Sequence, residues 1–307
     1  MSGVLQAAYQ NLRSFTSVPG APTIGTATAT GSTTATVSFT APASNGGATI
    51  TLYTATSSPG GITGTLAQAG SGTISITGLT AGTAYTFTVK ATNSIGESAA
   101  SAASNTITTV PIIGQAFGGG YFAGQISTAG NGVANFNLVI GPIASSQSTK
   151  IYKNAATATS GADSVVNGAQ NTADIVADGN STVYPAAHFC NDLVIGGFSD
   201  WYMPAKNELE ICYYNLKPTT TNNSTASGIN TNAVPSRGSN YTTGTPAQTS
   251  AADFKSTGAE DFVNGDYWSS TEQSATYSWL QGFSDGYQNY ILKNTSARVR
   301  AMRKVAV

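Results

Sequence analysis

The sequence contains few charged residues. Asp, Glu, Lys and Arg together make up 9% of its 307 residues, and the formal net charge is −1, whereas soluble proteins usually contain about 25% charged residues. No run of Lys or Arg is present. This argues against nucleic acid as a partner, because nucleic-acid-binding proteins need a basic surface to neutralise phosphates. Solubility must therefore depend on the abundant hydroxyl and amide side chains.

Long hydrophobic runs are also missing. No apolar stretch approaches the roughly 18 residues that a membrane-spanning helix needs, so we expect no membrane insertion. The opening residues, MSGVLQAAYQNLRSF, lack a basic region followed by an apolar core. A Sec signal peptide is therefore not expected, which disfavours a secreted bacterial surface protein.

Two cysteines and one histidine leave little material for catalytic or metal chemistry. Cys190 and Cys212 each fall on the apolar side of an expected helix, which favours buried free thiols over a disulfide. His188 has no nucleophile motif with which to form a catalytic triad, and no C-x-x-C pair suggests zinc. We therefore expect a protein that is not an enzyme and needs no cofactor.

One acidic group could supply the oxygen ligands that calcium prefers. It consists of Glu260, Asp261 and Asp266 together with Asn264. A solvated acidic loop is the favoured interpretation of these residues, and calcium binding is the minor alternative.

Residues 18–110 show the alternation that is typical of a β-sandwich. In TTATVSFTAP, the apolar residues Ala35, Val37 and Phe39 alternate with Thr and Ser, and AYTFTVKAT repeats this pattern. Clusters of Gly, Pro, Ser and Asn separate such runs about every 8 to 12 residues. The pattern predicts short antiparallel strands in two packed sheets.

The stretch ISITGLTAGTAYTFTVKATNSIGESAAS resembles the last three strands of a fibronectin type III domain. Leu79 and Tyr85 match the tyrosine corner of that family, and Asn93 and Gly96 match its turn before the last strand. Phe39 stands where the family usually has Trp, which implies a slightly smaller core. The resemblance implies a spacer or binding module.

Residues 111–307 show a mixed pattern. PAAHFCNDLVIGG predicts a helix with Pro185 at its first position and Gly196 at its C-terminal end. PAKNELEICYYNLKP predicts an amphipathic helix that stops before Pro218, and NTADIVAD predicts a short helix with Asn171 as its N-cap. After Pro218, about 50 residues show neither the hydrophobic periodicity of a helix nor that of a strand. A loop of this length is uncommon unless it is functional or anchored.

Four motifs in this second region occur in a recognisable order. They are GGFSDWYMPAKNEL (196–209), YWSSTE (267–272), F-x-x-G (283–286) and RVRAMR (298–303). Together they resemble the C-type-lectin-like domain found at the C-terminus of bacterial collagen-like adhesins and in many phage proteins. Ala205 stands where this family commonly has Thr, so we expect a weaker helix cap. The two resemblances imply two domains, an all-β fibronectin type III sandwich followed by an α+β C-type-lectin-like domain.

Residues 267–290 hold seven of the 28 aromatic residues in the chain. Asp285 followed by glycine predicts a β-hairpin, and we expect Trp201, Trp268, Leu280 and Ile291 to lie in the core. Tyr and Trp mixed with Asn and Gln on a rigid frame of strands is typical of a recognition surface. The predicted ligand-binding residues are Tyr277, Trp279, Gln281, Asp285, Tyr287, Asn289 and Lys293.

The opening segment, residues 1–17, carries apolar residues at near-helical spacing. Because such a stripe needs a partner surface, we expect residues 1–17 to be an assembly segment. With the spacer and the lectin-like end, it resembles virion proteins of tailed bacteriophages. This resemblance implies a non-enzymatic fibre or adhesin protein of the virion surface or tail. We expect a homo-oligomer that contacts other virion proteins through residues 1–17 and a host-surface glycan or protein through its head. A purely structural virion component, such as a capsid decoration or fibre shaft protein, and a bacterial surface adhesin are the alternatives.

Overall fold

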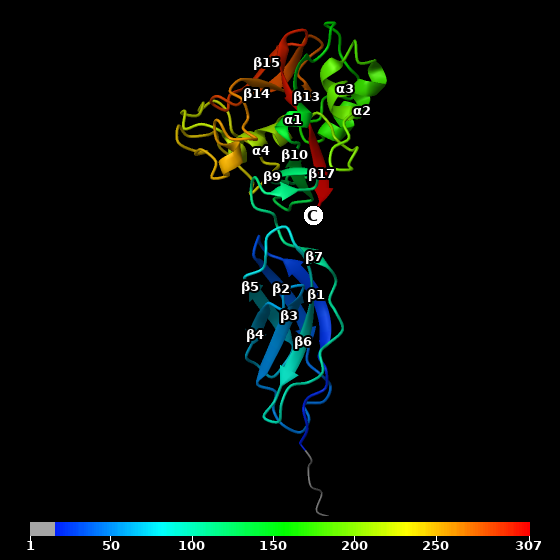
Figure 1. The fold of residues 1–307 in the computed structure, drawn as a ribbon, viewed down its shortest axis with the longest axis vertical. Helices are drawn as coiled ribbons and strands as arrows, with labels where there is room; N and C mark the ends of the chain where they lie inside the picture. Colours follow the sequence, from blue (N-terminus) through cyan, green and yellow to red (C-terminus); the bar gives the residue numbers. More distant parts are fainter. Residues whose placement is uncertain (1–15) are drawn as a thin grey trace, which may run out of the picture. The chain divides into compact units, whose positions relative to one another are not determined.

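The computed structural model describes residues 16–307, and the chain divides into two compact units. The first unit is Met1–Pro111 and the second is Ile112–Val307 (Figure 1). The chain is mostly β-sheet with few helices. Within residues 16–307, no helix is long and apolar enough to cross a bilayer. The predicted assembly segment lies outside the described residues except for Thr16 and Ser17.

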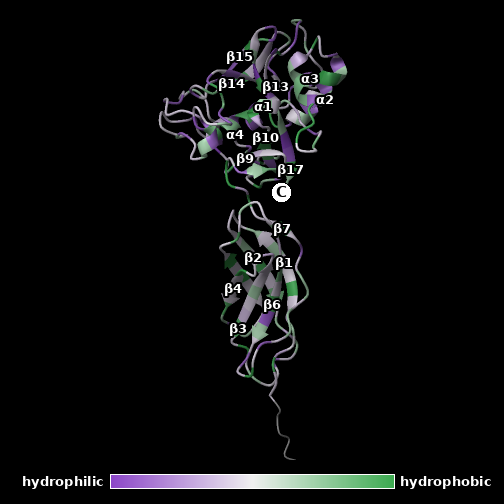
Figure 2. Ribbon diagram, viewed as in Figure 1, coloured by the Kyte–Doolittle hydropathy of each residue, from purple (hydrophilic) through white to green (hydrophobic). Residues whose placement is uncertain are grey.

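The first unit is a β-sandwich, as the alternation predicted. One sheet has the order β1-β2-β5 and the other has the order β4-β3-β6-β7. The strands are β1 (Thr23–Ala29), β2 (Thr34–Thr40), β3 (Leu52–Ser58), β4 (Thr63–Leu66), β5 (Gly72–Thr77), β6 (Ala84–Thr92) and β7 (Ile107–Thr108). Pale shades dominate this unit in Figure 2, because its strands are built largely from Thr, Ser, Ala and Gly.

The core of the sandwich contains the residues that the alternation placed there. Val37 and Phe87 are fully buried, and Phe39 packs against Tyr53 with ring centroids 4.2 Å apart. The Tyr85 hydroxyl accepts a hydrogen bond from the backbone N–H of Thr80 at 3.0 Å, which is the geometry of a tyrosine corner.

Three serines replace a regular edge strand beside β6. Ser98, Ser101 and Ser104 each pair with one β6 residue, donating a backbone N–H to its carbonyl and accepting its N–H with the side-chain hydroxyl. A serine at every third position thus provides hydrogen-bond partners for the backbone N–H and carbonyl groups of every second residue of β6. Ser17 also belongs to the sandwich and not to the assembly segment, because its N–H bonds the Gly46 carbonyl at 2.7 Å.

The second unit contains two five-stranded sheets. The first has the order β12-β9-β10-β17, with β8 paired to β9, and the second has the order β11-β16-β13-β14-β15. The strands are β8 (Ala116–Phe117), β9 (Gly120–Ile126), β10 (Phe136–Ile140), β11 (Gln147–Ile151), β12 (Ala233–Val234), β13 (Asp266–Glu272), β14 (Tyr277–Gly282), β15 (Gln288–Leu292), β16 (Ser296–Arg300) and β17 (Met302–Ala306). The helices are α1 (Ile143–Ser146), α2 (Gly168–Asp178), α3 (Pro185–Asn191) and α4 (Lys206–Leu216), with a 3-10 turn at η1 (Ala252–Phe254).

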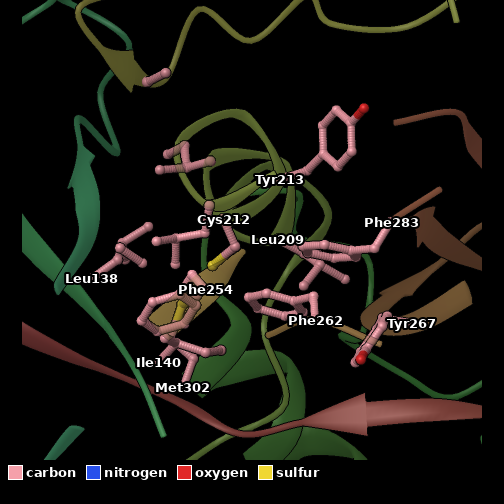
Figure 3. Packing of buried hydrophobic residues seen from close by; sticks show 14 of the residues in the cluster. Leu138, Ile140, Leu209, Cys212, Tyr213, Phe254, Phe262, Tyr267, Phe283 and Met302 are labelled. Atoms are coloured by element: carbon pink, nitrogen blue, oxygen red, sulfur yellow. The ribbon is translucent and has the colours of Figure 1, made fainter. Parts of the chain in front are cut away.

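Helix α4 packs its apolar side on a core that both sheets share. Figure 3 shows this core, with side chains from α4 (Leu209, Cys212), β10 (Leu138, Ile140) and β17 (Met302). The rings of Phe262 and Phe283 stack with centroids 3.8 Å apart and add an aromatic layer. Cys190 and Cys212 are both free and buried, as predicted.

The helix ends differ from the sequence predictions in two places. Asn167, not Asn171, caps α2, since its side chain accepts from the Gln170 N–H; Asn171 is buried one turn later. Helix α3 ends at Asn191 and not at Gly196. Gly196 lies instead in a turn between Ile195 and Phe198. Its φ of 63° explains the glycine there.

The cap of α4 is not as weak as Ala205 implied. Glu208 reaches back and accepts the Ala205 N–H at 2.8 Å, which is half of a capping box. The Lys206 N–H donates to the Thr271 hydroxyl at 3.0 Å. A hydroxyl from the YWSSTE motif thus satisfies an N–H group of the first helical turn, which sequence spacing could not reveal.

The long polar segment after Pro218 is anchored to α4. Glu210, fully buried on α4, accepts hydrogen bonds from Asn230, Arg237 and Tyr241. All three partners belong to the segment that showed no period. Its order therefore comes from buried polar contacts and from core residues such as Phe254 and Phe262, with little regular secondary structure.

Candidate recognition site

Strands β14 and β15 form an antiparallel hairpin at one edge of the second sheet. The pairing register sets Tyr277 opposite Leu292 and Trp279 opposite Tyr290. Directly opposed residues project on the same side of a sheet. These four side chains therefore form one surface, which we call the aromatic face.

The aromatic face is open to solvent. Tyr277 is 38% exposed, Tyr290 and Leu292 are each 44% exposed, and Trp279 is half-buried. The Tyr290 ring meets Tyr277 and Trp279 in edge-on contacts, with centroid distances of 5.6 and 5.4 Å. The rings therefore hold one another in place while leaving their outer surfaces free for a ligand.

Lys206 adds a positive charge to this surface. Its Nζ lies 3.9 Å from the centroid of the Trp279 ring, a close cation–π contact. Partial burial lowers the pKa of Lys206, and the Glu210 carboxylate opposes this effect. The first residue of α4 thus fixes the Trp279 ring and places an ammonium group beside it.

The opposite side of the hairpin belongs to the core. Leu280 and Ser278 are buried, and Ile291 packs at the edge of the cluster that contains Trp268. One hairpin therefore carries a buried side that fixes it to the fold and an exposed side that is apolar and aromatic.

Comparison with known protein families assigns both units. Residues 20–107 match the model of the fibronectin type III domain, and residues 151–303 match the model of the Lcl C-terminal domain. The chain thus carries a fibronectin type III domain and an Lcl C-terminal domain. The aromatic face lies wholly within the Lcl C-terminal domain.

Solved structures match a smaller share of the chain. Domains A168–A170 of titin are 27% identical over 30% of this chain and 32% of that chain, with a TM-score of 0.27. The twitchin kinase region from C. elegans is 25% identical over 31% of this chain and 17% of that one, also with a TM-score of 0.27. A fourth human FNIII domain is 23% identical over 38% of this chain and 96% of that one, with a TM-score of 0.27. The chain thus spans about a third of the titin fragment, and no curated protein matches it.

The motif residues of the Lcl C-terminal domain mainly hold its frame together. Trp201 and Trp268 are buried, and their indole N–H groups donate to the carbonyls of Phe198 and Lys150. Arg300, in the terminal RVRAMR motif, is fully buried. Its guanidinium group donates to the carbonyls of Gly141 and Glu260 and to the Glu260 carboxylate. These positions therefore contribute to packing and not to the exposed surface.

Two of the seven predicted ligand-binding residues are buried, so the prediction of their exposure is wrong. Gln281 is 1% exposed, and its Oε1 has no hydrogen-bond partner among the described residues. Lys293 is also 1% exposed, and its ammonium group pairs with Glu272 at 2.7 Å. Gln281 pairs with Tyr267, which belongs to the core cluster that contains residues of α4, so this end of that side of the sheet is covered.

Tyr277 and Trp279 lie on the aromatic face as predicted, whereas Asp285, Tyr287 and Asn289 do not. Asp285 shapes the turn by accepting the Tyr287 N–H at 3.0 Å, and Tyr287 is 42% exposed in that turn. Asn289 pairs with Leu280 and so lies on the opposite side of the hairpin from Trp279. Their position as ligand contacts stays a prediction.

Tyr290, Leu292 and Lys206 were not among the predicted ligand-binding residues. The reason is the register: odd-numbered residues of β14 pair with even-numbered residues of β15, as Trp279 does with Tyr290. The predicted surface residues of β15 were odd-numbered, whereas the even-numbered Tyr290 and Leu292 share the side of Trp279. Contact between Lys206 and Trp279 depends on tertiary structure alone.

The acidic group proposed for calcium is not assembled as a site. Both carboxylate oxygens of Glu260 are engaged, Oε1 by the Tyr121 hydroxyl and Oε2 by the Ile143 N–H and Arg300. Among residues 16–307, no group of three or more His, Cys, Asp or Glu residues is placed to hold a metal ion. Glu260 is therefore an internal partner of Arg300 and not a calcium ligand.

Proposed function

We propose that this chain is a non-enzymatic adhesion or recognition protein in which the aromatic face of the second unit binds the ligand. The observation that carries this proposal is the exposure of Tyr277, Tyr290 and Leu292 beside Trp279 on a rigid hairpin. Tyr and Trp supply a large contact area and have few rotatable bonds, so ordering them costs little entropy. The two matched domain families agree with an adhesive role.

In this proposal the second unit is an α+β C-type-lectin-like head and the fibronectin type III domain is a spacer. The ligand is a host-surface glycan or protein. The aromatic rings and the Leu292 side chain would cover its apolar parts, and the ammonium group of Lys206 would contact a polar or acidic group. Asp285 and Tyr287 would extend the contact at the turn, and Asn289 would contact the ligand only from the other side of the hairpin.

We further propose that the protein belongs to the virion of a tailed bacteriophage, where residues 1–17 attach it to other virion proteins and it forms a homo-oligomer. The support is the combination of an apolar opening segment, a spacer and an adhesin-type end domain. Antibody labelling of intact particles, viewed by electron microscopy, tests this location. Absence of label from purified particles that contain the gene would contradict it.

A purely structural virion component is the second candidate, because the hairpin has a free edge. β15 is a terminal strand of its sheet, and it exposes Tyr290 and Leu292. An exposed edge with apolar side chains can pair with another copy of the same chain. The aromatic face would then be a seam between copies.

Substitution of Trp279 and of Tyr290 by Ala separates the two candidates. If the face binds a ligand, each change should weaken attachment to host cells by about thirtyfold, near 2 kcal/mol, and leave the melting temperature and oligomeric state unchanged. Val194→Ala is a matched control, since it removes an apolar side chain that is 71% exposed elsewhere on the unit. Normal attachment combined with a lower melting temperature or a dissociated oligomer would show a seam.

A further inference from the structure

A hollow feature of the second unit lies outside the hairpin. A cavity of about 550 Å³ opens among segments that are far apart in the sequence. Its lining includes Thr128, Phe136, Val166, Asn167, Asp200 and Lys304. Pockets of roughly 300–1,000 Å³ are typical of small-molecule sites, and none of these residues belongs to the aromatic face.

The charges that line this cavity are already compensated. The ammonium group of Lys304 lies 3.0 Å from the buried carboxylate of Glu208. Asp200 forms a two-point contact with the guanidinium group of Arg303, at 2.8 and 2.9 Å. Two cations and two anions therefore balance, so the cavity has no excess charge with which to select an anion or a cation.

The cavity still offers hydrogen-bonding capacity. Each Asp200 oxygen accepts one bond from Arg303 and can accept another, and the Asp200 side chain is 55% exposed. The Asn167 Oδ1 already accepts from Gln170 and Lys304. Its amide NH₂ group is therefore the part of Asn167 left to donate to a ligand.

An apolar wall completes the cavity. Phe136 and Val166 both line it and are half-buried, so part of each side chain faces the open volume. A ligand that fits must combine hydroxyl groups, for the carboxylate and the amide, with an apolar surface that packs on an aromatic ring. A pyranose ring has both features: hydroxyl groups at its edge and C–H groups on its faces.

We propose that this cavity binds one ring of a neutral carbohydrate. Two neighbouring hydroxyl groups donate to Asp200, a further oxygen accepts from the Asn167 amide, and one C–H face packs on Phe136. The site is separate from the aromatic face, so the second unit has two contact regions for an extended surface ligand. The proposal does not depend on the aromatic face being a ligand site.

The test uses the full chain and the methyl glycosides of glucose, galactose, mannose and N-acetylglucosamine, with binding followed by NMR titration. We expect at least one of them to bind with a dissociation constant on the order of millimolar, as suits a single small ring. Ala169→Trp should weaken this binding at least tenfold, because exposed Ala169 lines the cavity and a large side chain fills it. Ala177→Trp is the matched control, since Ala177 is an exposed position on the same helix outside the lining.

The outcomes are distinguishable. Unchanged melting temperatures for both tryptophan variants, with binding lost only in Ala169→Trp, would support the proposal. Phe136→Leu should also weaken binding, because it removes the ring and keeps the apolar volume. The proposal is overturned if none of the four glycosides binds, if Ala169→Trp binds normally, or if sulfated glycosides bind in preference to neutral ones. Loss of glycoside binding in Trp279→Ala alone would assign the sugar to the aromatic face.

Discussion

The two units place their charged side chains differently. Among the described residues, the first unit has a single ion pair, between Lys90 and Glu97, with side chains that are 45% and 56% exposed. The second unit has six, and at least one partner in each is no more than 9% exposed. The sandwich keeps its charges in water, whereas the second unit uses charges inside its fold.

This difference follows from how each unit satisfies its backbone. The strands of the sandwich pair with one another over most of their length, and neutral side chains such as the serine hydroxyls beside β6 satisfy other backbone groups, so no charged partner is needed there. The second unit contains long irregular segments, and buried polar groups in such segments must find partners. Glu210 and Arg300 supply those partners from regular elements, which ties the loops to the sheets and to α4.

The largest effect should come from Glu210→Gln. Burial raises the pKa of Glu210, while Arg237 opposes that shift and the Tyr241 hydroxyl donates to the same carboxylate. The amide keeps the shape and removes the charge, which leaves the guanidinium of Arg237 without its partner. We expect the free energy of unfolding of the full chain to fall by roughly 3–5 kcal/mol, measured by chemical denaturation.

Glu97→Gln is the matched change in the first unit. The pair that it breaks is exposed, so the loss should be no more than about 1 kcal/mol. Similar losses for the two variants would contradict the comparison, because the buried charge of Glu210 would then contribute no more than a surface charge.

The sandwich could be predicted from the sequence because its order is local. Alternation in the strands places Val37 and Phe87 in the core without any knowledge of the rest of the fold. The serine ladder of Ser98, Ser101 and Ser104 was missed, since its period of three matches neither a strand nor a helix. What it satisfies is visible only beside β6.

The candidate site was only partly predictable. The sequence identified the aromatic stretch and the core position of Leu280. It did not identify Tyr290 as the partner of Trp279, because the register of β14 and β15 depends on a connection that is longer than two residues. Gln281 was placed on the surface because alternation alone does not show that its pairing partner Tyr267 extends the core to that end of the sheet. Lys206 lies 73 residues before Trp279 (279 − 206 = 73), so their contact left no local pattern.

A smaller effect should separate two tyrosine hydroxyl groups. Tyr241→Phe removes a donor to the buried carboxylate of Glu210, and hydrogen bonds to charged groups contribute about 1.5–3 kcal/mol. Tyr85→Phe removes a neutral bond to the Thr80 N–H, worth about 0.5–1.5 kcal/mol. Denaturation of the two variants, each compared with the unmodified chain, measures the difference. A larger loss for Tyr85→Phe would show that the corner of the sandwich matters more than the buried carboxylate.

The smallest effect concerns threonine hydroxyl groups. Thr271→Val should lower the free energy of unfolding by about 1 kcal/mol, because the Thr271 hydroxyl accepts the Lys206 N–H at the start of α4 and donates to the Ser164 carbonyl. Thr36→Val is the matched change, at a half-buried position on the outer side of β2. Val and Thr both suit strands, so this variant should unfold within about 0.5 kcal/mol of the unmodified chain. If both variants behave alike, the hydroxyl from the YWSSTE motif does not replace the missing cap at Ala205. A cost confined to Thr271→Val would instead show that a strand far along the chain supplies what the helix's own first residues lack.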